Sequence, residues 1–504
     1  MRNIKTKTPW RVVRPDGALR NKSFVGTDTP LYEYRSQADF VREYYPSGHK
    51  IHSTLHYPNI FREVTEEILD ADGNPTGKSR KLYYEEMVPR YAFAFQQIIA
   101  TKQLVHLCGN DVQFDLLNKE NKDHLRILEQ FRDGWAEKDM ETAFYSLARS
   151  VKITGDGAIV CYREDGAFSW RSLSFLDDDK LYPHYDRNGN LCLFARAFSD
   201  YEDDGETKAD FLEVWDAQNY YLLKSGEDST QEITFCRGRI GIQGYELIEK
   251  APHGFPRIPV VYYRDKDGAC WSNSQDSIDM YEISFSQMAQ NNKSFGEPIM
   301  WLRGDNIDCI PDQNGTIKTL TMGTGDEAGY LPAQSASESY HKQLDLTYKL
   351  IYEQSFAVIP PELKSGDLPA AALKILYSPA YEKASIDCLD YQAPLSELVY
   401  LFMIGYGMEC KCTIDFQNIP LKWWLKPYVH VNWSTTISDL MNAVNSGFLS
   451  KQTASERISE YSTPKEWARI QEELQTKLTQ ELEAKIAERK ATADTQTSPK
   501  PKTE

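Results

Sequence analysis

Hydrophobic positions in the first third of the chain recur at helical spacing. Around residues 89–107 the apolar side chains stand three or four positions apart, and Gly109 follows as a helix stop. The pattern predicts helices over residues 36–45, 89–107, 122–136 and 139–153. Residues 1–35 show no periodicity and are expected to form an extended arm.

From Gly155 to about Arg264 the pattern changes to short β-type runs separated by turn residues. Strands are expected over residues 157–162, 168–173, 191–198, 211–215, 220–223 and 260–263. Upstream, the segment Asp70–Pro75 reads as a tight turn between two short strands. It begins like a calcium loop, but Lys81 occupies the twelfth position, so a plain turn is expected. Helices followed by an antiparallel sheet predict an α+β arrangement.

The middle of the chain contains two amphipathic helices. They are expected over Asp276–Phe295 and Ser337–Gln354, because apolar residues fall on one face of each segment. A strand-and-turn insert of about forty residues, 296–335, separates them. Two helices that bracket a small β insert predict a hairpin-like protrusion.

Prolines divide the segment that follows. Pro360 and Pro361 cannot continue a helix, and a polar loop comes directly after them. A long helical stretch over Pro369–Met408 is then expected, with kinks or short breaks at Pro379 and Pro394.

The C-terminal part is expected to be helical after a strand over Tyr428–Trp433. A capping box at Thr463–Glu466 marks the start of the last helix. Its narrow apolar stripe needs a partner, either the preceding helix or an adjacent protomer, with a coiled-coil dimer as the alternative. The stripe consists of Trp467, Ile470, Leu474, Leu478, Leu482 and Ile486. Residues 491–504 are polar and predict a disordered tail.

Composition limits the functions that fit these elements. With 504 residues and 41% hydrophobic content, the chain can form two or three domains with substantial cores. Its nine cysteines are scattered and form no Cys-x-x-Cys pair, so neither a disulfide framework nor a zinc site is indicated. No apolar run is long enough to span a bilayer, so a soluble protein that starts in the cytoplasm is expected. The formal charge of −17 argues against a broad DNA-gripping face, but it does not exclude a protein that DNA slides past.

Candidate chemistry is scarce. Asp177–Asp179 with His184 could be imagined as a nuclease metal site, but Lys180 intrudes and no second acidic cluster pairs with it. The glycine-rich run Gly323–Gly329 lacks the Lys-Ser/Thr ending of a phosphate loop. The sequence therefore predicts no catalytic residue, no metal site and no cofactor, and favours a structural protein over an enzyme.

The order of the elements resembles the portal proteins of long-tailed bacteriophages from about residue 85 to about residue 490. Several segments carry this resemblance: helices that close on a glycine before a short strand, a Pro-Val strand before the first amphipathic helix, and a helix after the polar loop. These segments are Gln103–Phe114, Ser146–Tyr162, Gly254–Val261 and Ala371–Ala384.

The resemblance implies a phage portal fold with an α/β wing, a two-helix stem, a small β clip and a helical crown. The wing would span residues 36–272 and 357–435, the stem helices 273–295 and 336–356, the clip 296–335 and the crown 436–490. It further implies a dodecameric ring at the capsid vertex of a virion, assembled in the host bacterial cytoplasm, through which double-stranded DNA is packaged and ejected. The implied partners are the terminase large subunit, a head-tail adaptor, and the major capsid and scaffolding proteins.

By the same resemblance, residues 359–368 form the channel loop. Its candidate residues are Pro360, Pro361, Lys364, Ser365, Gly366 and Asp367. Lys364 is the main candidate for a transient phosphate contact. Further candidates on the stem are Lys293, Lys342 and Lys349, unless they face outward or pair with neighbouring subunits. The clip candidates are Arg303, Asp305, Asp308 and Lys318, within an insert where acids predominate.

Two other functions stay open at this point. One is a non-portal head-completion or minor head protein that binds only proteins. The other is the metal-dependent nuclease built on Asp177–Asp179 and His184.

Overall fold

The computed structural model divides the chain into two compact units. The first consists of residues 1–362 and 376–428, and the second of residues 363–375 and 429–504. The structure describes residues 35–69, 75–117, 121–186, 188–201, 205, 207–235, 238–295, 300–303, 308–311, 317–321, 327–330, 337–359, 375–410, 420–429, 433–457 and 466–496. The expected arm of residues 1–35 lies outside these ranges except for its last residue.

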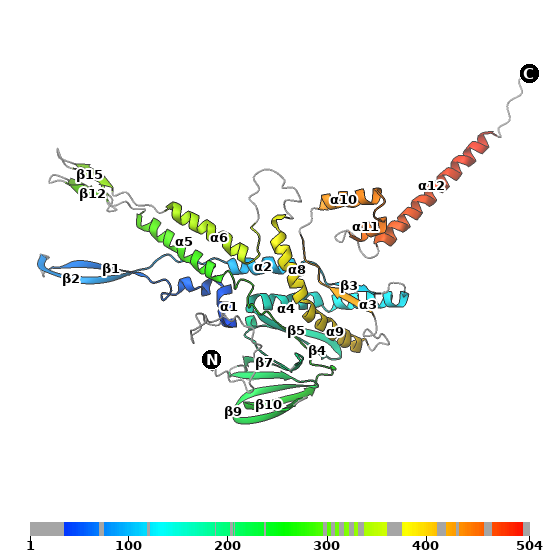
Figure 1. The fold of residues 1–504 in the computed structure, drawn as a ribbon, viewed down its shortest axis with the longest axis horizontal. Coiled ribbons are helices and arrows are strands. Elements are labelled where there is room, and N and C mark those ends of the chain that lie inside the picture. The colour runs from blue at the N-terminus through cyan, green and yellow to red at the C-terminus, as the bar shows by residue number, and fades with distance from the viewer. Residues whose placement is uncertain are drawn as a thin grey trace, which may run out of the picture. The chain divides into compact units, whose positions relative to one another are not determined.

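Helices form the main core of the first unit (Figure 1). They are α1 (Gln37–Tyr44), α2 (Phe95–Cys108), α3 (Lys122–Glu137), α4 (Met140–Thr154), α8 (Ser378–Asp390) and α9 (Gln392–Glu409). Leu147, Phe131 and Phe402 are buried together where α4, α3 and α9 meet. Gly155 ends α4 with a φ of 85°, a left-handed conformation that glycine adopts without strain, and the chain then turns into a strand.

Two antiparallel sheets extend the first unit. The three-stranded sheet has the order β11-β4-β5, and the five-stranded sheet has the order β10-β9-β8-β7-β6. Their strands are β4 (Asp156–Glu164), β5 (Ala167–Leu173), β6 (Lys180–Tyr185), β7 (Leu191–Tyr201), β8 (Lys208–Trp215), β9 (Asn219–Phe235), β10 (Gly238–Pro252) and β11 (Val260–Arg264). The mixed α+β class expected from the sequence is confirmed.

The two predicted amphipathic helices are present as α5 (Gln275–Phe295) and α6 (Ser337–Gln354). Between them lie β12 (Met300–Arg303), β13 (Asp308–Pro311), β14 (Ile317–Thr321) and β15 (Glu327–Tyr330). The outer strands β12 and β15 pair with each other, and the inner strands β13 and β14 pair with each other. Both pairs are antiparallel, so the insert has the strand order of a hairpin.

A two-stranded ribbon precedes α2. It is built from β1 (Ile60–Leu69) and β2 (Pro75–Glu86), which pair along their length in antiparallel register. The strands are longer than the sequence indicated, and most of the predicted turn between them falls outside the described residues. No helix in the described part of the chain is long and apolar enough to cross a membrane.

The helical stretch after residue 375 has short breaks next to Pro379 and Pro394, one of the two outcomes expected there. It forms α8 and α9, which are separated at Tyr391. Pro379 and Pro394 lie in the first turns of these helices, where the missing proline N–H has no intrahelical acceptor to lose. The prolines therefore start helices and do not kink one.

Two other boundaries expected from the sequence are wrong. The helix predicted from residue 89 begins at Phe95, and residues 89–94 before it have no regular secondary structure. The strand expected at Tyr428–Trp433 is instead β16 (Leu421–Trp424), which pairs with β3 (Gln113–Leu116) far upstream. Trp433 begins the helix α10 (Trp433–Asn445).

The second unit is helical in its described part. After α10 come α11 (Lys451–Arg457) and α12 (Glu466–Gln496). The last helix extends beyond residue 490, so the expected tail begins at 497 or later. The stripe residues Leu474, Leu478 and Leu482 are 43, 58 and 59% exposed, so the described residues leave them largely uncovered.

Candidate functional site

The stem is the part of the molecule in which α5 and α6 lie side by side. Gln343 on α6 donates from Nε2 to Ser284 Oγ on α5 at 3.1 Å. Nearer the base, Ser277 Oγ donates to Gln354 Oε1, also at 3.1 Å. Because the residue pairs run in opposite order along the two helices, the helices are antiparallel, and the hairpin-like protrusion predicted from the sequence is confirmed.

Aromatic rings close the base of the stem. The Phe95 ring at the start of α2 meets the rings of Tyr281 on α5 and Tyr348 on α6, with centroids 5.3 and 5.9 Å apart. Tyr352 packs on the same phenylalanine at 6.2 Å. Edge-to-face contacts of this kind add to the free energy of simple burial. Both α5 and α6 are thus anchored to one ring at the start of α2.

A buried polar pair provides a second anchor for α5. His49 Nδ1 lies 2.6 Å from Glu282 Oε1, and His49 Nε2 donates to the carbonyl oxygen of Glu43 at 2.7 Å. The backbone N–H of Phe93 donates to the same Glu282 oxygen at 2.8 Å. The side chains of His49 and Glu282 are both 1% exposed, so breaking this pair would leave a desolvated polar group.

Helix α2 also holds the end of the stem and the start of α8. Gln103 Nε2 donates to the carbonyl oxygen of Ser355, just past α6, at 2.9 Å, and Lys102 Nζ donates to that of Val358. The His106 ring packs edge-on against Tyr381 of α8 at 5.5 Å. The two ends of the segment that contains the predicted channel loop are therefore fastened to one helix.

A buried cation reinforces this junction. Lys152 on α4 donates to Asp387 Oδ2 on α8 at 2.7 Å and to Gln103 Oε1 on α2 at 3.1 Å. Lys383 pairs with the other Asp387 oxygen at 2.8 Å. Burial lowers the pKa of Lys383, but the Asp387 carboxylate outweighs that effect, and the net shift is upward. Sequence patterns give no signal for this network, since its members are far apart in the chain.

The predicted stem lysines differ in their surroundings. Lys293, near the end of α5, forms an ion pair with Glu86 of β2 at 3.1 Å. Lys342 and Lys349 are exposed on α6, and within the described ranges neither has an ion pair. The structure brings these two onto one face with Leu346 and Leu350, an apolar pair that the sequence analysis did not single out.

The predicted clip and loop residues are only partly described. Arg303 lies exposed at the end of β12, Asp308 begins β13, and Lys318 is on β14. The calls outside the described residues are Asp305, Pro360, Pro361, Lys364, Ser365, Gly366 and Asp367.

The residues of the alternative nuclease site do not form a metal-binding cluster. Arg196 Nε donates to Asp179 Oδ1 at 2.6 Å, and its Nη1 donates to Glu213 Oε2 at 2.9 Å. Burial raises the pKa of Asp179, and the Arg196 charge offsets only part of this rise. His184 lies on β6 opposite Leu193 of β7. In the described residues no group of three His, Cys, Asp or Glu side chains is placed to hold a metal.

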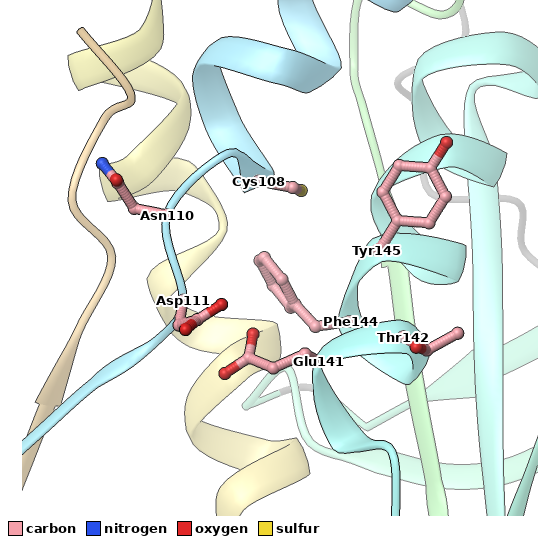
Figure 2. A pocket seen from close by; sticks show the side chains of 7 residues that line it. All are labelled: Cys108, Asn110, Asp111, Glu141, Thr142, Phe144 and Tyr145. Atoms are coloured by element: carbon pink, nitrogen blue, oxygen red, sulfur yellow. The ribbon is translucent and has the colours of Figure 1, made fainter. Parts of the chain in front are cut away.

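A pocket of about 190 Å³ opens between the end of α2 and the start of α4 (Figure 2). Asp111 and Glu141 present their carboxylates to it. Glu141 is already engaged, because Trp135 Nε1 and the backbone N–H of Val112 donate to its Oε1, each at 3.0 Å. Burial raises the pKa of the lining thiol Cys108 to about 12, which keeps it protonated and unreactive. The pocket contains no nucleophile–base pair.

The described chain thus combines two antiparallel helices that bracket a β insert with a mixed α/β body. The model of the family described as phage portal protein, SPP1 Gp6-like, matches residues 32–480. The chain belongs to this portal family.

Three of the solved structures similar to this chain come from gene transfer agent (GTA) particles. A chain in the neck of an empty particle, computed with C6 symmetry, is 12% identical, with a TM-score of 0.37, covering 72% of this chain and 87% of that one. A chain in the native virion is 10% identical, with a TM-score of 0.36 and coverages of 71 and 86%. One in the native neck, computed with C12 symmetry, is 11% identical, with a TM-score of 0.39 and coverages of 71 and 88%. No curated protein matches the sequence.

Proposed function

We propose that copies of this portal protein assemble into a ring, expected to be dodecameric, that encloses a channel for double-stranded DNA at a capsid vertex. The observation that carries the proposal is the family match over residues 32–480, which includes the two-helix stem and its insert. A ring needs each subunit to present a rigid element near the axis. The stem meets this need, since aromatic packing, the His49–Glu282 pair and the α2 contacts all fix its base.

DNA passage would rely on weak contacts. A chain with a net charge of −17 does not present the dense cationic surface that drives tight phosphate binding. In this proposal Lys364 is the transient phosphate contact, within a channel loop of residues 359–368. Support comes from the anchoring of the flanking residues Val358 and Tyr381 on α2.

The clip would be the docking site for proteins outside the capsid. Its four strands form a narrow insert at the far end of the stem, and Arg303 is exposed there. We assign the head-tail adaptor and the terminase large subunit to this end, and the major capsid and scaffolding proteins to the wing side. The assembled protein would form part of the virion after assembly in the bacterial cytoplasm.

Images of the purified full-length protein in negative stain test ring formation. Rings with a central hole are expected. Compact particles without a hole at every concentration would overturn the proposal and favour a head-completion or minor head protein.

A packaging assay tests the channel loop. Lys364→Ala should change the amount of DNA packaged or retained while leaving ring assembly intact, because one weak phosphate contact is removed. Lys208→Ala, an exposed lysine of the wing strand β8, is the matched control and should package as the unaltered protein does. Equal packaging by Lys364→Ala and the unaltered protein would contradict the role of this lysine.

The protein is also proposed to lack enzymatic activity. Incubation with duplex DNA and magnesium should leave the DNA uncut, because Arg196 already holds the Asp179 carboxylate that a nuclease would need. Magnesium-dependent cleavage that is lost in Asp177→Ala would restore the nuclease hypothesis.

A further inference from the structure

The ribbon β1–β2 pairs with none of the other described strands. Within the described residues it is a separate two-stranded sheet, drawn in blue in Figure 1. Isolated two-stranded ribbons are at best marginally stable in water. Nevertheless this ribbon exposes large apolar side chains, with Phe61 68% and Tyr83 67% exposed. Such side chains on an unsupported ribbon indicate that another molecule covers it.

One face of the ribbon combines aromatic rings with carboxylates. Register places Phe61 opposite Glu85 and Glu63 opposite Tyr83, and cross-strand partners share a face. Phe61 and Tyr83 are therefore diagonal neighbours, about 7 Å apart. Glu63 is paired with Lys81 at 2.5 Å, whereas Glu85 accepts only an uncharged hydrogen bond, from Asn59 at 2.8 Å. The face thus joins two exposed aromatic rings to one carboxylate, Glu85, that has no ion pair among the described residues.

The outer face of α6 has the complementary pattern. Leu346 is 54% exposed and Leu350 is 45% exposed, and the two are one turn apart, about 6 Å. Lys342 lies four residues before Leu346, and Lys349 lies three residues after it, so exposed lysines flank the leucines. The two leucines, with Lys342 and Lys349 beside them, match in spacing the two aromatic rings with Glu85 beside them, and the exposed Glu353 lies one turn further along the helix.

The ribbon also contacts the stem of its own copy. Glu86, the last residue of β2, pairs with Lys293 of α5, and the backbone N–H of Tyr91 donates to Ser286 Oγ on α5 at 3.1 Å. The ribbon is thus attached to the α5 side of the stem, while the leucine–lysine face belongs to α6. Closed rings of more than two subunits join unlike faces of successive copies, and these two faces are unlike and complementary.

We infer that the ribbon of one copy docks on the α6 face of the next copy in the ring, with Phe61 and Tyr83 against Leu346 and Leu350 and Glu85 beside Lys349. The inference rests on the proposed ring assembly. It gives Lys342 and Lys349 a role in subunit contact and not in DNA contact.

A disulfide trap tests the contact in the full-length protein. Tyr83→Cys combined with Leu346→Cys should yield, after mild oxidation, a ladder of covalent multimers on a non-reducing gel. Each single variant is the control for the native cysteines and should give no such ladder. All of these positions are exposed, so folding should be retained, and a thermal melt checks it.

A charge exchange tests the same contact without cysteines. Glu85→Lys and Lys349→Glu should each raise the protein concentration needed for ring assembly by roughly tenfold, because like charges then face each other. The combined variant should restore assembly. Glu246→Lys, an exposed reversal on β10, is the matched control and should have no effect.

The outcomes separate this inference from the proposed function. If the unaltered protein forms no rings, the proposed function fails. If rings form but the cysteine pair gives no ladder, only the docking inference is overturned. If Lys342→Ala with Lys349→Ala lowers DNA packaging while assembly is unchanged, the lysines face DNA and the docking inference is also overturned.

Discussion

Lys152 shows how single residues fasten the portal subunit together. Its ammonium group is buried with a side-chain exposure of 1%, and it is compensated by Asp387 on another helix. A buried charge is tolerated only when it is paired and hydrogen-bonded, and here both conditions hold. The network joins α2, α4 and α8.

Removing Asp387 should therefore be costly. Asp387→Ala is expected to lower the free energy of unfolding by about 3–5 kcal/mol, since it leaves Lys152 buried without its partner. Glu397→Ala removes one carboxylate from an exposed pair with Arg257 and should cost less than about 1 kcal/mol. Chemical denaturation of both variants measures the difference, and equal losses would show that the Lys152 network does not stabilise the fold.

A second buried network makes the stability of the wing sheet depend on pH. Burial raises the pKa of Glu213, but hydrogen bonds and charge from Arg171 and Arg196 outweigh it, so the net pKa is below the ordinary 4.5. A depressed pKa in the folded state contributes stability above the ordinary value, and that contribution is lost as pH falls through the folded value.

Glu213→Gln should expose this dependence. The gap in melting temperature between the unaltered protein and the variant is expected to be largest near neutral pH and to shrink as pH is lowered from about 5 to about 3. Melts across that range measure it. A gap that stays constant would mean that the Glu213 charge does not stabilise the folded state.

At the scale of elements, close packing between helix and sheet sets the geometry of the wing. Gly405 of α9 lies directly against the ring of Phe168 on β5, and an added Cβ would overlap that ring. Phe168 is 2% exposed and cannot move into solvent. The helix can approach the sheet this closely only because the residue has no side chain.

Gly405→Ala should lower the free energy of unfolding by about 1–3 kcal/mol through overpacking. Combining it with Phe168→Leu should recover part of the loss, because the smaller side chain leaves room for the methyl group. Denaturation of both single variants and the double variant checks this coupling. Simple additivity of the two single losses would exclude the proposed clash.

The element pattern was predictable where periodicity is strong and local. Apolar spacing located α5 and α6 to within a residue at each end, because each helix has one buried face and one solvated face. It failed for β16, whose partner β3 lies about three hundred residues upstream, since such pairing leaves no local signal. The short break expected near Pro394 lies at Tyr391, because the proline occupies the first turn of the following helix.

The candidate site was predictable only as a list of charged residues. Sequence located Lys293, Lys342 and Lys349 on the stem, but their directions depend on how α5 and α6 pack. Lys293 pairs with Glu86, a partner that no spacing rule connects to it. The surface of Leu346 and Leu350 emerges only when the buried face of α6 is known.

For the whole molecule, charge balance predicts weak binding to free DNA. With a net charge of −17, the chain should bind duplex DNA with a Kd of roughly 10⁻⁵ M or weaker at physiological salt. Fluorescence anisotropy at several salt concentrations measures both the affinity and its salt slope. A steep slope, indicating release of roughly six or more counterions, would contradict a conduit that DNA slides past.

The fastening of both Ser355 and α8 to helix α2 has a mechanical consequence. Both contacts are made by the same helix, so force on the polypeptide between Ser355 and α8 should change the distance between them little. Force on that span would act on α2. From α2 it would reach α5 through Phe95 and α4 through Lys152. In the proposed conduit, force on that span would therefore reach the body of the subunit directly, because one helix holds both of its ends.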